Sequence, residues 1–98
     1  MRAVLIRTGG FGGLTRRWTA EPPALTAEGE ARLRQAADRA GFFALPPLQR
    51  AARPSPDRFV WSLEVDDGAR RNAVRFDEDA ASEELMALVE LVQDLAGG

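Results

Sequence analysis

The chain has 98 residues, of which 45% are apolar and 29% charged, a composition typical of one folded domain and not of a disordered segment. Its formal net charge of −2 predicts no attraction to nucleic acid or to an anionic membrane surface. The N-terminal apolar run stops at Ile6, too short for a signal peptide, and no segment approaches the ~20 apolar residues of a membrane span. We therefore expect one cytoplasmic domain over residues 1–98 that is a monomer when free.

The residue types present argue against catalysis. The chain contains no histidine, cysteine, lysine or tyrosine, the side chains that supply most general acid–base and nucleophilic chemistry. Zinc sites also draw on histidine or cysteine, and the acidic run Asp77–Asp79 lacks the longer alternation and the central glycine of a calcium loop. We expect neither an enzyme nor a bound metal or cofactor.

The N-terminal segment predicts two antiparallel strands joined by a glycine-rich connection. Residues Arg2–Thr8 contain a short apolar run rich in β-branched side chains, and residues Leu14–Thr19 alternate as a strand does. The alternation places Arg16 on the same face as Leu14 and Trp18. Such a mixed face is typical of an edge strand.

Two amphipathic helices are also predicted. Thr26 and Ser82 are expected N-caps, each followed by glutamates in the first turn, and Gly41 is placed to end the first helix. The apolar stripes are Leu33, Ala36, Ala37 and Ala40 in the first helix, and Leu85, Leu88, Val89, Val92 and Leu95 in the second. After the first helix, Phe43 and Leu45 are expected to close the end of the core, followed by a polar, proline-containing loop through Pro56.

Residues Asp57–Phe76 predict a second hairpin, because four apolar side chains alternate strictly with other residues and the dipeptide Asp67–Gly68 favours a two-residue turn. Such a turn pairs Phe59 with Phe76, Trp61 with Val74 and Glu64 with Arg71. The predicted order is therefore ββαββα. The expected fold is α+β, a four-stranded antiparallel sheet with both helices packed on one face.

The connection between the first two strands is unusual, because the four glycines Gly9, Gly10, Gly12 and Gly13 surround Phe11. A hairpin turn needs one or two such residues. Either the turn is loose and Phe11 folds back onto its own domain, or a partner approaches the backbone here. A dinucleotide-binding loop is disfavoured, since the GxGxxG spacing fails and the segment leads into a strand and not a helix.

Three stretches, together with the closing amphipathic helix, resemble the emfourin family of small proteinaceous inhibitors: Thr8–Trp18, Leu25–Pro47 and Pro56–Phe76. The glycine-rich loop and the Phe-Phe-Ala-Leu-Pro turn are the specific parts, although Thr8 stands where serine often precedes the glycines. The resemblance implies one emfourin-like domain that inhibits a protealysin-like (thermolysin-like) zinc metalloprotease in the cytoplasm, without a cofactor.

Our hypothesis for the site is occlusion of the protease cleft, because the chain has no histidine or cysteine to chelate the protease metal. Thermolysin-like enzymes, as a class, prefer a bulky apolar residue just after the scissile bond. The expected protease-binding residues are therefore Gly9, Gly10, Phe11, Gly12, Gly13 and Leu14, with Phe11 or Leu14 in that pocket and Arg16 at its rim.

Two other functions stay open from the sequence. One is an adaptor that uses a sheet face bearing Arg16 and Arg71. The other is a small-molecule sensor with a pocket under Phe42 and Phe43. The loop Arg50–Pro56 is a possible second contact under any of these functions.

Overall fold

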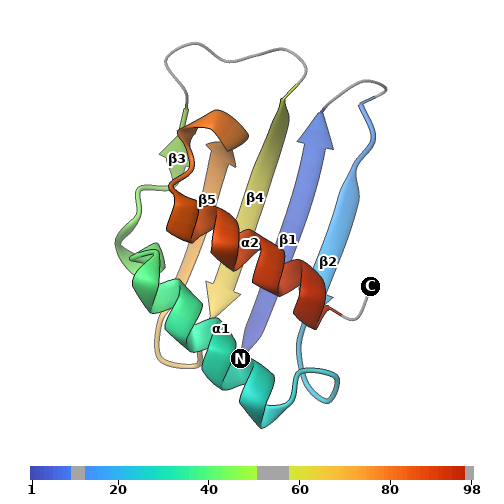
Figure 1. The fold of residues 1–98 in the computed structure, drawn as a ribbon, viewed down its shortest axis with the longest axis vertical. Coiled ribbons are helices and arrows are strands. Elements are labelled where there is room, and N and C mark those ends of the chain that lie inside the picture. Colours follow the sequence, from blue (N-terminus) through green and yellow to red (C-terminus); the bar gives the residue numbers. More distant parts are fainter. Residues whose placement is uncertain (10–12, 51–57, 97–98) are drawn as a thin grey trace.

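The computed structural model describes residues 1–9, 13–50 and 58–96, whose strands and helices follow the order ββαβββα (Figure 1). The elements are β1 (Arg2–Gly9), β2 (Arg16–Ala20), α1 (Ala27–Arg39), η1 (Phe42–Ala44), β3 (Leu48–Gln49), β4 (Phe59–Asp66), β5 (Arg71–Asp77), η2 (Glu78–Ala80) and α2 (Glu83–Leu95), where η marks a short 3-10 helix. Within these ranges no helix is long and apolar enough to span a membrane. The α+β class and both predicted helices are confirmed.

The sheet has five strands in the order β2-β1-β4-β5-β3 and is mixed, so the prediction of four antiparallel strands is wrong. The four expected strands do pair antiparallel. The fifth strand, β3, pairs parallel with β5, and beside it the Arg75 N–H donates to the Pro47 carbonyl at 2.8 Å. β3 lies in the segment predicted to be a loop, and a two-residue strand is too short for any alternation of side chains to indicate it.

The β4–β5 hairpin has a different register from the predicted one. Its loop contains four residues, 67–70, so Trp61 pairs with Phe76 instead of Val74, and Glu64 faces Ala73 instead of Arg71. The register differs by an even number of residues, so each side chain stays on its predicted face. The Arg71 guanidinium still reaches Glu64 diagonally, with 2.7 Å between Nη2 and Oε2.

The Asp67 side chain is the reason for the longer turn. The backbone N–H groups of Arg70 and Ala69 donate to its Oδ1 at 2.6 and 2.9 Å, and these bonds lower the pKa of Asp67 below its ordinary value. Its other oxygen lies 3.4 Å from the Arg34 guanidinium of α1 and 3.2 Å from that of Arg70. The carboxylate is only 2% exposed and joins the turn to α1.

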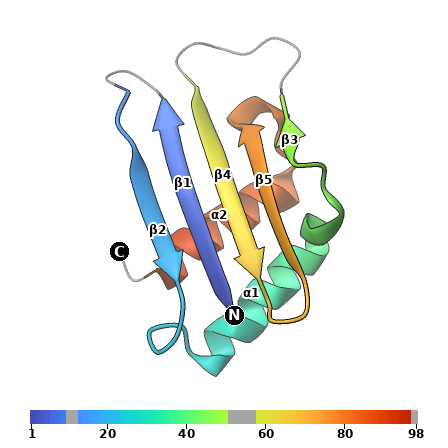
Figure 2. The same cartoon turned by 180° about the vertical axis from the view of Figure 1, so that it is seen from behind.

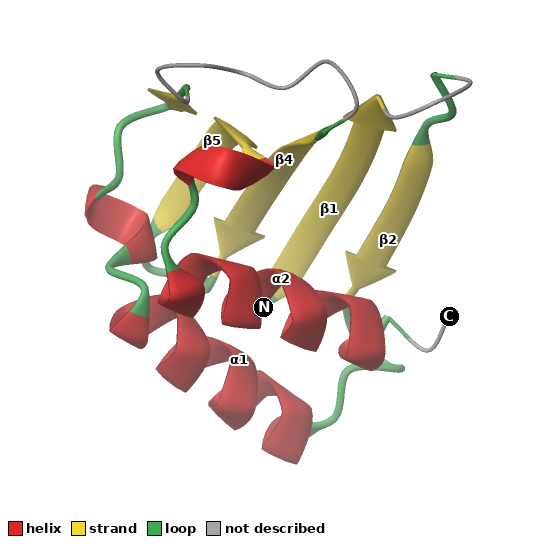
Figure 3. Cartoon of the chain, turned by 45° about the horizontal axis from the view of Figure 1, so that its top comes forward, coloured by secondary structure: helices red, strands yellow, loops and turns green. Residues whose placement is uncertain are grey.

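Both helices cover the same face of the sheet, as predicted, and lie side by side in one layer (Figure 3). The expected N-caps are confirmed, because the Thr26 and Ser82 hydroxyls accept from the N–H groups of Gly29 and Leu85 at 3.1 and 3.0 Å. Gly41 follows α1 with φ +60°, as its predicted role requires. The core contains, among others, Leu5, Leu33, Phe42, Leu63, Val65, Phe76, Leu85, Leu88 and Val92, all at most 1% exposed.

The opposite face of the sheet, here called the outer face, is not covered by any described helix (Figure 2). Arg71 lies on this face opposite Asp66, whereas Arg16 pairs with Arg7 on the helix-covered face. The expectation that one sheet face bears both Arg16 and Arg71 is therefore wrong. β2 presents Arg17, not Arg16, on the outer face.

Candidate functional site

The predicted protease-binding segment connects β1 to β2 at one end of the sheet (Figure 1). Gly9 is the last residue of β1 and Arg16 the first of β2, while Gly10, Phe11 and Gly12 lie outside the described residues. Leu14 is 78% exposed. Burial of such an exposed apolar side chain by a partner is favourable, and complete burial contributes roughly 1.5–3 kcal/mol to binding. The segment therefore presents an exposed apolar side chain at one end of the sheet.

Gly9 has a backbone conformation that other residues rarely adopt, with φ +98°. It pairs with Phe59, and a Cβ at this position would lie 3.1 Å from the Arg58 carbonyl oxygen. Gly13 also has a positive φ of +60°, but a Cβ there would meet no atom within 4 Å among the described residues. Gly9 is thus required by its backbone angle and by the close approach of Arg58, and Gly13 by its backbone angle alone.

An arginine–aromatic cluster supports the segment from the helix-covered side and consists of Arg7, Arg16, Trp18, Phe59 and Trp61. The Arg7 guanidinium lies 4.3, 5.5 and 5.8 Å from the ring centroids of Phe59, Trp18 and Trp61, respectively. The Arg16 guanidinium lies 4.9 Å from the Trp18 ring. Each such contact contributes about 0.5–1 kcal/mol at an exposed site. The cluster joins β1, β2 and β4 just below Gly9.

The sequence predicted Arg16 on the same face as Trp18 and at the rim of the protease contact, but neither this cluster nor the contact of Arg7 with Phe59. The alternation of β1 does contain the signal, since it places Arg7 on the same face as Ala3 and Leu5, which are completely buried. Arg16 was expected as a rim contact of the protease, but in the structure its side chain already contacts an aromatic ring of its own domain. Its guanidinium is already stacked on Trp18.

The connection between β3 and β4 lies beside the glycine-rich segment, because β4 starts at the end of the sheet where β1 ends. Gly9 pairs with Phe59, and Arg58 forms an ion pair with Asp79 of η2, at 3.4 Å. Residues 51–57, which contain most of the proposed second contact Arg50–Pro56, lie outside the described residues. The strands that flank it place the end of β3 and the start of β4 at the same end of the sheet as the end of β1 (Figure 1).

The pocket that the sensor alternative expects under Phe42 and Phe43 corresponds to a small hollow in the structure. Phe42 is fully buried, Phe43 packs against the core, and a hollow of about 280 Å³ remains beside them. The Arg70 guanidinium lies 4.2 Å from the Phe43 ring centroid and covers one side. In the described part of the chain, no three acidic side chains are grouped so that they could hold a metal ion.

Comparison with known proteins gives one result. No curated protein and no solved structure matches the chain. The family model described as Emfourin matches residues 5–93, which include the glycine-rich segment, the whole sheet apart from the first residues of β1, and nearly all of α2. This family is an inhibitor family, consistent with a protease-inhibitor role and with a protein that is not an enzyme. With nearly the whole chain matched, the protein belongs to the Emfourin family.

Proposed function

We propose that the chain inhibits a protealysin-like (thermolysin-like) zinc metalloprotease by occluding its active-site cleft. The contact residues are Gly9–Leu14 together with Arg16. The single observation that carries this assignment is the 78% exposure of Leu14 in a glycine-rich segment of a chain from an inhibitor family. The side chain fits the apolar pocket that this class of enzyme offers next to the scissile bond.

The surrounding geometry supports tight binding. The segment begins and ends in paired strands, and the arginine–aromatic cluster holds those strands together below it. A loop with fixed ends loses less conformational entropy on binding than a free peptide does. Glycine at several positions lets the protease approach the backbone without meeting a Cβ.

The proposal is tested by titrating a purified protealysin-like protease with this protein and measuring residual peptidase activity. We expect a break near one equivalent of inhibitor. Leu14→Ala is expected to weaken inhibition roughly ten- to hundredfold, the equivalent of losing one buried apolar side chain. The matched control is Leu48→Ala, which removes the other exposed large hydrophobic side chain of the described residues, at 52% exposure on β3.

Phe11→Ala and the double variant with Leu14→Ala complete the experiment. If the folded double variant inhibits as well as the unchanged protein, the glycine-rich segment is not the contact site. If the unchanged, folded protein leaves several protealysin-like enzymes fully active at large excess, the inhibitor assignment itself is wrong for this protease class.

A further inference from the structure

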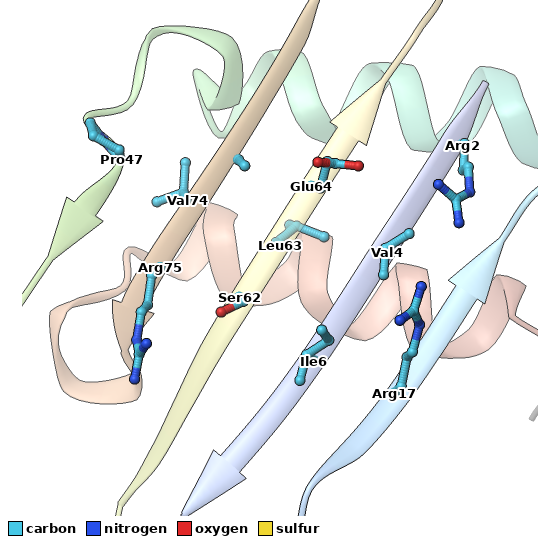
Figure 4. A pocket seen from close by; sticks show the side chains of 11 residues that line it. Arg2, Val4, Ile6, Arg17, Pro47, Ser62, Leu63, Glu64, Val74 and Arg75 are labelled. Atoms are coloured by element: carbon cyan, nitrogen blue, oxygen red, sulfur yellow. The ribbon is translucent and has the colours of Figure 1, made fainter.

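The outer face of the sheet, opposite the arginine–aromatic cluster, carries a hollow of about 400 Å³ (Figure 4). Side chains from four neighbouring strands line it. Val4 and Ile6 of β1 form its apolar floor, and Figure 4 shows Arg2 and Arg17 on one side of them and Arg75 on the other. The hollow therefore combines an apolar centre and basic borders with one carboxylate, that of Glu64, which is paired with Arg71 (Figure 4).

One row of residues crosses the hollow from edge to edge. Arg17 pairs with Ile6, Ile6 pairs with Ser62, and Ser62 pairs with Arg75, so these four side chains lie in line on β2, β1, β4 and β5. Three strand spacings separate the two arginines, which places their backbones about 14 Å apart. The row has a guanidinium at each end, with an aliphatic group and a hydroxyl between them.

The two arginines of this row differ from the other outer-face arginines in their partners. Arg2 is paired with Glu21 at 2.9 Å and Arg71 with Glu64 at 2.7 Å. Arg17 and Arg75 are exposed and form no ion pair with any described carboxylate. The positive charge at the two ends of the row is thus available to a ligand.

We infer that this row binds an extended acidic segment of a partner protein, with carboxylates at positions i and i+4 and an apolar side chain at i+2. In an extended chain, side chains at i, i+2 and i+4 point to one side, and four residue steps cover about 13 Å. That length matches the separation of Arg17 and Arg75, and the central side chain then rests on Val4 and Ile6. Arginine pairs with a carboxylate through two parallel hydrogen bonds, which favours this partner chemistry.

This site goes beyond the proposed inhibition and does not depend on it. Arg17 and Arg75 lie on the face opposite the arginine–aromatic cluster that supports the glycine-rich segment. A segment with two correctly spaced carboxylates uses the whole row.

The test is an NMR titration of the ¹⁵N-labelled protein with the peptide acetyl-Glu-Thr-Val-Thr-Glu-amide at millimolar concentration. We expect saturable shifts of the Ile6 and Ser62 amides, which weaken as salt is added. Arg17→Gln and Arg75→Gln are each expected to weaken binding about fivefold, as the loss of one exposed charge pair does. Arg32→Gln, which removes an exposed arginine of α1, is the matched control.

Two further peptides separate specific binding from general attraction to acidic chains. Acetyl-Gln-Thr-Val-Thr-Gln-amide lacks the charges, and acetyl-Thr-Glu-Glu-Val-Thr-amide places them side by side. Both are expected to bind at least fivefold more weakly. The inference is overturned if the outer-face amides do not shift, if the three peptides bind equally, or if the arginine variants behave like the Arg32→Gln control. Leu14→Ala is expected to leave this binding unchanged whatever its effect on inhibition.

Discussion

Replacing Gly9 by alanine tests whether the end of β1 is built as the structure shows. Gly9 has φ +98°, and a Cβ added there would lie 3.1 Å from the carbonyl oxygen of Arg58, the residue before β4. An L-residue in the left-handed region costs about 1–2 kcal/mol. The tight contact is with backbone, so β4 must shift by a few tenths of an ångström or the pair with Phe59 must open.

Gly13→Ala is the matched control, because Gly13 has φ +60° but open space where its Cβ would be. Both variants gain a similar small stabilisation from the reduced entropy of the unfolded chain, about 0.4–1 kcal/mol, which cancels in the comparison. We expect Gly9→Ala to be less stable than Gly13→Ala by about 1 kcal/mol. For a domain of this size, that difference lowers the midpoint of thermal unfolding by about 4–8 °C.

The assay is thermal unfolding followed by tryptophan fluorescence, since Trp18 and Trp61 both lie in the cluster below Gly9. Equal midpoints for Gly9→Ala and Gly13→Ala would refute the close approach of Arg58. The proposed inhibition gives a second measurement on the same proteins. Gly9→Ala is expected to weaken it more than Gly13→Ala, because it disturbs the strand that holds the segment.

Two further predictions concern stability. Arg7→Met keeps the aliphatic part of the side chain and removes the charge that lies over three aromatic rings, so we expect a loss of about 1 kcal/mol and a midpoint about 4–8 °C lower. Arg17→Met, on the other face of the sheet, is the control, and equal midpoints for the two variants would contradict a stabilising role of the cluster. Asp67 has a lowered pKa in the folded protein, so its stabilising effect is present above its unfolded pKa of about 3.9 and is lost as the pH falls through the folded value. We therefore expect Asp67→Asn to destabilise the protein at neutral pH, by an amount that shrinks in urea unfolding experiments below about pH 4, whereas a difference that is constant with pH would refute this.

The local features of the fold were predictable from the sequence, because they depend on residues close together in the chain. The N-caps Thr26 and Ser82 and the left-handed Gly41 act within one helical turn of their own backbone. The glycine-rich segment also follows from local composition, whereas the predicted strand Leu14–Thr19 begins only at Arg16 and leaves Leu14 exposed. The family assignment depends on the same stretches, and the family match confirms it.

The tertiary structure alone decided which distant residues meet. β3 exists because β5 presents a free edge to Leu48 and Gln49, and nothing within those two residues indicates a strand. The hairpin register depends on the Asp67 carboxylate, which accepts hydrogen bonds from backbone N–H groups and lies beside Arg34 of α1. These contacts favour the four-residue turn over the predicted two-residue turn. The contact of Arg7 with Phe59 requires β1 and β4 to be neighbours. The sequence therefore determined the two α-helices, the four longer strands and the candidate segment. Strand pairing, which joins residues far apart in the chain, determined the fifth strand and what supports that segment.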